Sequence, residues 1–220
     1  MFSDGPRRWR SITTVLIVAA LGLPVPAARA QSVQDDFVVA VVNDRVQEIK
    51  RLLGSGADPD MLDSNGDPVL VIAVRAGNTA TVDLLLATRA NVDARTKFGD
   101  TALMMGALLG RLDIVKKLRA RGASVNQQGW TPLMYAATGG HDDIVRYLLA
   151  EGAEMDASSP NGTTALMMAA REGKRSTVEL LVARGADVNR RNQSGASALD
   201  WARRSKEPAM VERLQRAGAR

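Results

Sequence analysis

Apolar and polar positions along residues 34–220 recur with a period of about 33 residues. Each period holds a short apolar segment, such as "TALMMGALLG", followed by an amphipathic one, such as "DIVRYLLAE". In the second segment Ile144, Val145 and Leu148 are spaced as on one face of a helix. A glycine stands just before the apolar segment of every period, at spacings of 33, 30, 33 and 33 residues: Gly66, Gly99, Gly129, Gly162 and Gly195. The pattern predicts repeated units of two short helices and a loop.

Residues with strong positional preferences support this unit. Pro132 is at a predicted first helical position, where proline is tolerated because a backbone N–H there would have no acceptor within the helix. Helix N-caps are predicted at four hydroxyl residues, Thr101, Thr131, Thr164 and Ser197. Tight turns between paired helices are predicted at Gly77, Gly110, Gly140 and Gly173. Left-handed residues are predicted to end the second helices at Gly56, Gly122, Gly152, Gly185 and Gly218. Asn65-Gly66 and Asn161-Gly162 are turn signals for projecting hairpins.

These motifs resemble the ankyrin repeat family, and "WTPLMYAATGGHDDIVRYLLAEGAEMD", Trp130 to Asp156, is the fullest copy. The resemblance covers nearly all of residues 31–220 and implies an all-α solenoid of about six stacked helix-turn-helix units in one domain. A single unit cannot bury its apolar face, so stability comes from stacking. The expected units are a cap at 34–66, internal repeats at 67–99, 100–129, 130–162 and 163–195, and a truncated cap at 196–220.

Three departures from the family pattern carry expectations of their own. The family usually has a histidine after Thr-Pro-Leu that ties the turn; Met104, Met134 and Met167 replace it here, with Val71 and Asp200 in the flanking units, so we expect that polar tie to be missing. Arg89 replaces a helix-ending glycine and would be strained in the left-handed conformation, so Arg89→Gly should raise the unfolding midpoint. The third unit lacks three residues before Trp130, which predicts a retracted hairpin and a notch.

The first 30 residues have the three parts of a secretory signal peptide. Basic residues precede an apolar stretch, Ile12 to Leu23, and Ala28-Arg29-Ala30 is a small-x-small cleavage site. Cleavage after Ala30 would give a periplasmic or secreted protein without stable membrane insertion; the stretch is short for a span of about 20 residues. A retained anchor is the alternative. The four arginines removed, against one aspartate, lower the net charge from +5 to +2.

The residues available for chemistry are few. The chain has no cysteine, which excludes disulfides and thiol catalysis. His141 is the only histidine, and a packing role is favoured over catalysis because no nucleophile or metal partner accompanies it. The methionines of the first helices are interpreted as core residues, with oxidant sensing as the alternative. The sequence therefore predicts no enzyme, cofactor or metal site, and no basic aromatic stripe suggests nucleic acid.

The remaining variable positions are candidates for binding a protein. The resemblance implies that partners dock on the hairpin tips and on the concave face of the first helices, as in other ankyrin proteins. The candidate residues there are Phe98, Asp100, Leu108, Leu109, Gln128, Trp130, Tyr135, Thr138, Arg75, Arg171 and Glu172. Aromatic anchors ringed by charges are typical of protein interfaces. The alternative is that Tyr135 belongs to the inter-repeat core and Trp130 shields the short hairpin.

The sequence thus favours a monomeric, non-enzymatic protein-binding module in the periplasm whose client is an exported enzyme or toxin. The alternatives are a structural adaptor in an envelope complex and a secreted effector that binds a host protein.

Overall fold

The computed structural model describes residues 33–205 and 207–220, and the predicted signal peptide lies outside them. The described residues contain α-helices and two isolated β-bridges, which confirms the all-α prediction. The first helices of the units are α1 Val33–Val42, α3 Val69–Ala76, α5 Ala102–Leu108, α7 Pro132–Gly139, α9 Ala165–Arg171 and α11 Ala198–Arg204. The second helices are α2 Val46–Gly54, α4 Thr79–Leu86, α6 Leu112–Ala120, α8 Asp142–Ala150, α10 Arg175–Ala183 and α12 Pro208–Arg216.

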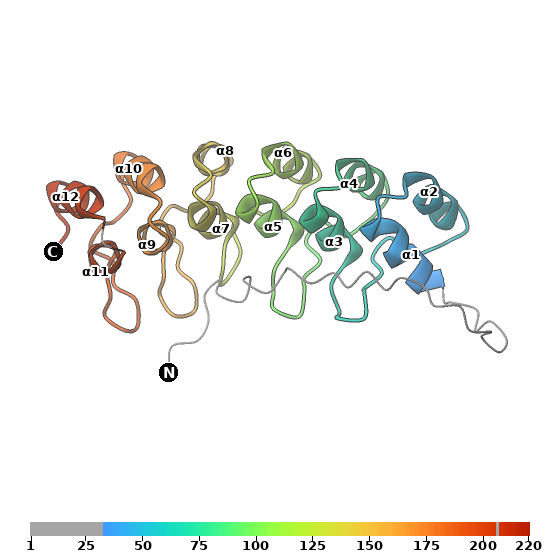
Figure 1. The fold of residues 1–220 in the computed structure, drawn as a ribbon, viewed down its shortest axis with the longest axis horizontal. Helices are drawn as coiled ribbons and strands as arrows, with labels where there is room; N and C mark the ends of the chain where they lie inside the picture. Colours follow the sequence, from blue (N-terminus) through green and yellow to red (C-terminus); the bar gives the residue numbers. More distant parts are fainter. Residues whose placement is uncertain (1–32, 206) are drawn as a thin grey trace, which may run out of the picture. The chain divides into compact units, whose positions relative to one another are not determined.

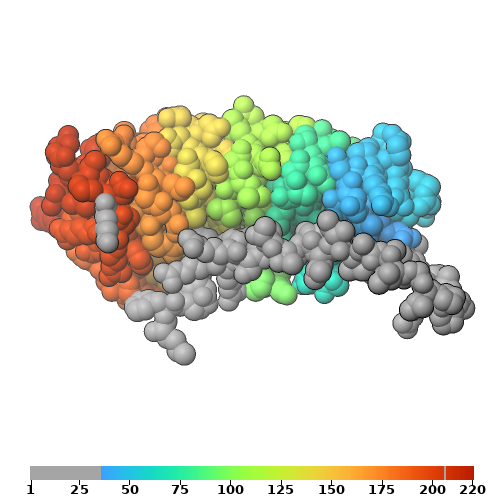
Figure 2. All heavy atoms as spheres, viewed as in Figure 1, coloured from blue at the N-terminus to red at the C-terminus, as the bar shows by residue number. Residues whose placement is uncertain are grey.

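The helices form two layers in one compact unit. Figure 1 shows the odd-numbered helices in one row, the even-numbered helices in a second row, and the loops projecting from the odd-numbered side. In the space-filling view the units follow one another in chain order (Figure 2). Ile114, Val115 and Leu118 of α6 are completely buried, as their helical spacing predicts. Because each unit packs on both neighbours, the core is continuous along the stack.

The predicted N-caps are confirmed. The hydroxyls of Thr101, Thr131, Thr164 and Ser197 each accept the backbone N–H three residues later. The expectation of a missing polar tie is wrong in two units. In α5 the Thr101 N–H donates to Met104 Sδ at 3.4 Å, and in α11 the Ser197 N–H donates to Asp200 Oδ2 at 2.9 Å. A thioether is a weak acceptor and a carboxylate a strong one, so the last cap is the best tied.

The predicted turn and helix-ending glycines all have positive φ, but Arg89 does not. The left-handed conformation expected for Arg89 is therefore wrong. Helix α4 ends at Leu86, and the hydroxyl of Thr88 donates to the Leu85 carbonyl at 2.5 Å while it accepts the Ala90 N–H at 3.1 Å. The Thr88 side chain thus replaces the backbone hydrogen bonds that a left-handed glycine makes at the other helix ends.

A repeated hydrogen bond joins each unit to the next, and we call it the loop ladder. Its acceptor is the last residue of the motif that follows each second helix, as in "SGADPD". Asp93 illustrates it, since its carboxylate accepts the Ser124 N–H at 3.0 Å and the Ser124 hydroxyl at 2.7 Å. The other links join Asp60 to Asn91, Asn126 to Glu154, Asp156 to Asp187, and Asn189 to Arg220. The carboxylate or amide of this motif therefore holds the stack in register.

The hairpin loops are closed by a second repeated arrangement. In the loop before α5 the Thr96 N–H donates to the Asp100 carbonyl, and the Thr96 hydroxyl accepts the N–H groups of Phe98 and Asp100. The same backbone closure occurs at 63–67, 159–163 and 192–196. Within the described chain it does not occur at 124–131, where the three residues are missing. The loop before α7 accordingly extends less far than its neighbours (Figure 1), as the shortened repeat predicts.

Five methionines of the first helices lie in the core, with at most 1% of their surface exposed: Met104, Met105, Met134, Met167 and Met168. A thioether buried to this degree meets oxidants only when the stack opens. The packing interpretation is therefore the one that the structure supports.

Candidate protein-binding face

The inner face comprises the hairpin loops, Leu109 just after α5, and two positions of each odd-numbered helix, at which Met105 and Met168 are completely buried. These positions are the fourth and seventh residues after the helix N-cap. The fourth-position residues are Ile72, Met105, Tyr135, Met168 and Trp201, and the seventh-position residues are Arg75, Leu108, Thr138, Arg171 and Arg204. Side chains from both positions contact hairpin residues, as Arg75 does Asp67 and Tyr135 does Asp100. The inner face therefore contains most of the candidate residues.

Asp100, Tyr135 and Trp130 form the centre of this face. The Tyr135 hydroxyl donates to Asp100 Oδ1, which joins α7 to the hairpin of the preceding unit. The Trp130 ring meets the Tyr135 ring edge to face, with centroids 6.2 Å apart and planes at 88°, a favoured geometry for aromatic pairs. Asp100 and Tyr135 are buried, and Trp130 is half-buried. Tyr135 is thus inter-repeat packing, and Trp130 presents the accessible part of the cluster.

The environment of Tyr135 favours its neutral form. Burial raises the pKa of its hydroxyl well above the usual value, and the charge and hydrogen bond of Asp100 raise it further. A phenolate next to a buried carboxylate would place two negative charges together, at a cost in free energy. The hydroxyl therefore acts as a fixed hydrogen-bond donor. It does not act as an acid or base near neutral pH.

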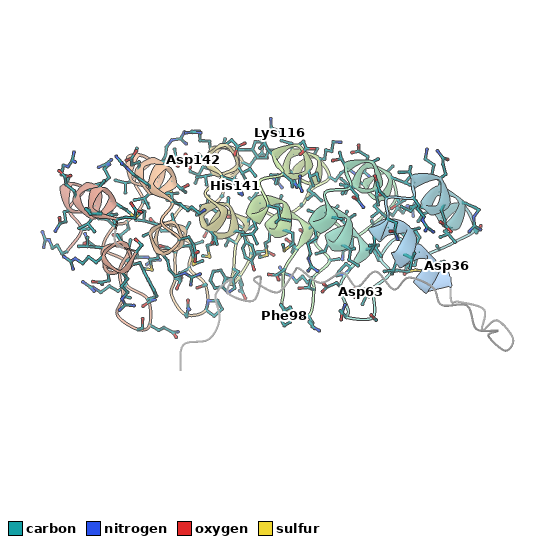
Figure 3. All side chains as sticks on the ribbon, viewed as in Figure 1. Asp36, Asp63, Phe98, Lys116, His141 and Asp142 are labelled. Atoms are coloured by element: carbon teal, nitrogen blue, oxygen red, sulfur yellow. The ribbon has the colours of Figure 1, made fainter. Side chains whose placement is uncertain are left out.

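The exposed apolar candidates belong to the unit of α5. Phe98 is 57% exposed and stands at the tip of the hairpin before α5 (Figure 3), on the same side as Asp63 of the preceding hairpin. Leu109, at the end of α5, is 39% exposed, and Leu108 is half-buried. The ammonium group of Lys97 lies 5.3 Å from the Phe98 ring centroid. These side chains are accessible to a partner without rearrangement of the stack.

The remaining candidates differ in how far a partner could reach them. Gln128 is exposed on the short loop. Thr138 is buried, and its hydroxyl donates to the Met134 carbonyl at 2.7 Å, so it belongs to the helix and is not accessible. Arg75 donates to Asp67 at 2.6 Å, and Arg171 donates to Glu172 at 2.9 Å. The two arginines are therefore held in place on either side of the central cluster.

Further inner-face residues were not singled out from the sequence. Trp201 of α11 lies beneath the guanidinium groups of Arg204 and Arg171, whose central carbons are 4.9 Å and 6.0 Å from its ring centroid. Val39 and Val42 of α1 are also exposed, at the positions that Ile72 and Arg75 hold one unit later. Aligning the units position by position would have found them, because residues one period apart occupy the same place on the face.

His141 has a packing role in the stack. It precedes α8, and its Nε2 lies 3.0 Å from the Leu108 carbonyl oxygen. Since a carbonyl only accepts, Nε2 carries the hydrogen. The ring covers Gly110, where an added Cβ would lie 2.6 Å from His141 Cε1. Asn78 occupies the same position earlier and donates to the Val41 carbonyl at 2.9 Å. This position satisfies the last carbonyls of the preceding first helix.

The described residues hold no cluster of three or more His, Cys, Asp or Glu side chains arranged for a metal ion. Across 33–205 and 207–220, no helix combines the length and apolar character that crossing a membrane requires.

Comparison with known proteins identifies the repeat. A family model described as ankyrin repeats (3 copies) matches residues 37–128, 121–192 and 151–220. The chain is 36% identical over 94 residues to alpha-latroinsectotoxin-Lt1a of Latrodectus tredecimguttatus, which is 42% of this chain and 7% of the toxin. It is 31% identical over 101 residues to human NF-kappa-B inhibitor alpha, 43% of this chain and 32% of that protein. The chain thus spans a third or less of these relatives.

Two solved structures are similar over most of the chain. An ankyrin repeat domain from Acinetobacter baumannii AYE superposes with a TM-score of 0.72 at 30% identity, covering 84% of this chain and 98% of that one. The human ASB11 ankyrin repeat domain superposes with a TM-score of 0.76 at 25% identity, covering 84% of each. Ankyrin repeats are protein–protein interaction modules, typically without enzymatic activity. The chain belongs to the ankyrin repeat family.

Proposed function

We propose that this chain is a non-enzymatic binding module of the periplasm that holds an exported enzyme or toxin on its inner face. The observation that carries the proposal is the exposure of Phe98 and Leu109 on a face whose backbone is fixed by the stack. Exposed apolar side chains grouped on one surface mark protein interaction sites. Trp130, half-buried at the end of the shortened loop, supplies an aromatic anchor of the kind that dominates binding energy.

Rigidity supports this role. Phe98 extends from a hairpin closed by Thr96, and Trp130 is packed on Tyr135, so neither side chain needs much ordering when a partner binds. Ordering an interface costs free energy, and a preformed surface avoids part of that cost. The proposed location rests on the signal-like residues 1–30.

The test is affinity capture from a periplasmic extract with the full chain carrying a C-terminal tag. Three proteins are compared by mass spectrometry: the parent, the double variant Phe98→Ala, Trp130→Ala, and the control Tyr147→Ala. Tyr147 lies on α8 in the opposite helix layer. We expect one client to be captured by the parent and the control and lost by the double variant. Capture that the double variant retains would count against the inner face as the binding surface.

The location is tested separately by exporting the chain in its host and determining its N-terminus. We expect the mature protein to begin at Gln31 in the periplasmic fraction. An uncleaved chain in the membrane fraction would favour the retained anchor instead.

A further inference from the structure

The inner face changes in chemistry from one end of the stack to the other. Among the described residues, the exposed large apolar side chains all precede residue 110: Val39, Val42, Leu62, Phe98 and Leu109. Two of them are on α1, one directly follows α5, and two are in the hairpin loops before α3 and α5. The first three units therefore hold all the exposed large apolar side chains of the described residues.

The opposite end of the same face is cationic and aromatic. Arg171 ends α9, Trp201 lies in the middle of α11, and Arg204 ends α11. The two guanidinium groups lie on the Trp201 ring. A ring in this position attracts the cations and keeps them on the surface of the face. The last two units therefore present positive charge on this face.

This cationic end has donors that the described chain leaves unsatisfied. Arg171 uses its Nε for Glu172, but its Nη2 and the Trp201 Nε1 have no acceptor there, although both atoms are buried. Arg204 forms no ion pair with a described residue, whereas the nearby carboxylate of Asp200 is already engaged by Arg191 and Arg203. Buried donors without acceptors cost free energy, and a carboxylate from a partner would satisfy them.

We propose that the inner face binds a partner segment that carries an apolar block and an acidic block, the acidic block contacting Arg171, Trp201 and Arg204. The inference rests on the proposed function and names the chemistry of the client. A carboxylate reaches the buried donors when the exposed Arg204 side chain moves off the ring. Arg171 then binds it through Nη2 while Nε stays with Glu172. A basic segment would be repelled at the same place.

The distance between the two ends sets the spacing of the blocks. Leu109 and Arg171 are at the ends of α5 and α9, two helices apart in the row. Packed helices are about 8–10 Å apart, so the separation is roughly 16–20 Å, which about six extended residues span. At the helix between them, Thr138 is buried and Gly139 has no side chain. The His141 ring lies against Gly139, so a partner segment that crosses the end of α7 passes the imidazole.

The test uses fluorescein-labelled peptides and the full-length protein. One probe has the block Leu-Val-Leu-Phe, six Gly and Ser residues, and a block of glutamates. A second probe has lysines in place of the glutamates. A third has the same composition as the first, but its apolar residues and glutamates alternate, so that neither block is present. Fluorescence anisotropy gives Kd for three proteins. These are the parent, the double variant Arg171→Ala, Arg204→Ala, and Arg175→Ala, a control in the opposite helix layer. Circular dichroism verifies that each variant is folded.

We expect the glutamate-block peptide to bind more tightly than the other two and its affinity to fall with added salt. The double variant should weaken it about tenfold, which corresponds to the loss of roughly one charge-assisted contact, and the control should not. Equal binding of the lysine peptide, unchanged binding by the double variant, or no binding of any peptide would overturn the inference. If the client captured from the periplasmic extract is still captured by Arg171→Ala, Arg204→Ala, the proposed function stands and only the acidic chemistry of the client fails.

Discussion

The Tyr135 hydroxyl donates a hydrogen bond to the Asp100 carboxylate, across the boundary between two units. Both side chains are buried, and the Tyr135 ring also packs edge to face with the Trp130 ring. The contact therefore stabilises the stack and fixes the aromatic surface at once. Any change to it should affect both stability and binding.

Tyr135→Phe should lower the free energy of unfolding by about 1–3 kcal/mol, because the Asp100 carboxylate loses a donor while it stays buried. Urea denaturation followed by circular dichroism measures the change. Tyr147→Phe is the control, since Tyr147 is less buried than Tyr135 and removal of its hydroxyl should cost less than about 0.5 kcal/mol. Equal effects of the two variants would mean that the hydrogen bond to Asp100 contributes no more than the hydroxyl of a half-buried tyrosine.

The same contact makes stability depend on alkaline pH. The pKa of Tyr135 is raised above its unfolded value of 10.0. Its contribution is complete below that value and is lost progressively as the pH rises above it, because only the unfolded chain releases the proton. In Tyr147→Phe, which leaves Tyr135 as the single tyrosine, the ultraviolet absorbance of phenolate should appear together with unfolding. Phenolate formation near pH 10 in a folded chain would contradict the buried hydrogen bond.

The loop ladder is tested by Asp93→Ala. This change removes the acceptor for both the N–H and the hydroxyl of Ser124 and should cost about 1–3 kcal/mol. Asp83→Ala is a matched control, because its ion pair with Lys117 is exposed and should contribute less than about 1 kcal/mol. Urea midpoints of the two variants give the comparison. A larger loss from Asp83 would remove the ladder as an explanation of how the units are held.

The helix end at Thr88 reverses the expectation for Arg89→Gly. Because Arg89 is not left-handed, glycine relieves no strain and adds freedom to the unfolded chain. Arg89→Gly should therefore lower the free energy of unfolding by about 0.5–1 kcal/mol, and the unfolding midpoint should fall with it. Thr88→Ala should lower it further because the hydroxyl bridge between Leu85 and Ala90 is lost. A higher midpoint for Arg89→Gly would require a helix end different from the one described.

Methionine burial predicts where peroxide acts first. Met61 and Met155 are partly exposed in loops, whereas the five first-helix methionines are in the core. Peptide mass spectrometry after brief peroxide treatment should find sulfoxide at Met61 and Met155 well before Met104 or Met134. Early oxidation of Met104 would reopen the oxidant-sensing hypothesis.

The sequence predicted what depends on local chemistry. The caps at Thr101 and Ser197 and the left-handed Gly77 follow from residue types that few other conformations accommodate as well. The conformation of Arg89 was predicted wrongly because a neighbouring hydroxyl supplied the missing hydrogen bonds, and a pattern of glycines does not show such a substitute.

The contacts of the binding face were harder to foresee. Phe98 and Leu109 are exposed, as a binding role requires, but exposure also depends on neighbours, and Thr138 and Asp100 are buried by theirs. Asp100 and Tyr135 are 35 residues apart, and their contact depends on how one unit stacks on the next. The binding role of all these residues remains a prediction for the capture experiment.

The loop ladder also bears on how such a protein can change in length. The link from Asn126 to Glu154 spans 28 residues where the others span 31, yet in all of them a backbone N–H donates to the side-chain oxygen of the last motif residue. The missing residues lie in the hairpin that this link encloses, and the hydrogen bond still forms, so stacking is insensitive to them. Deletion or insertion in the hairpins, and duplication of a whole unit, can therefore alter the recognition surface while every junction between units keeps the same bond. The hairpins can thus vary in length and sequence, whereas each junction needs the backbone N–H and the side-chain oxygen of the loop ladder.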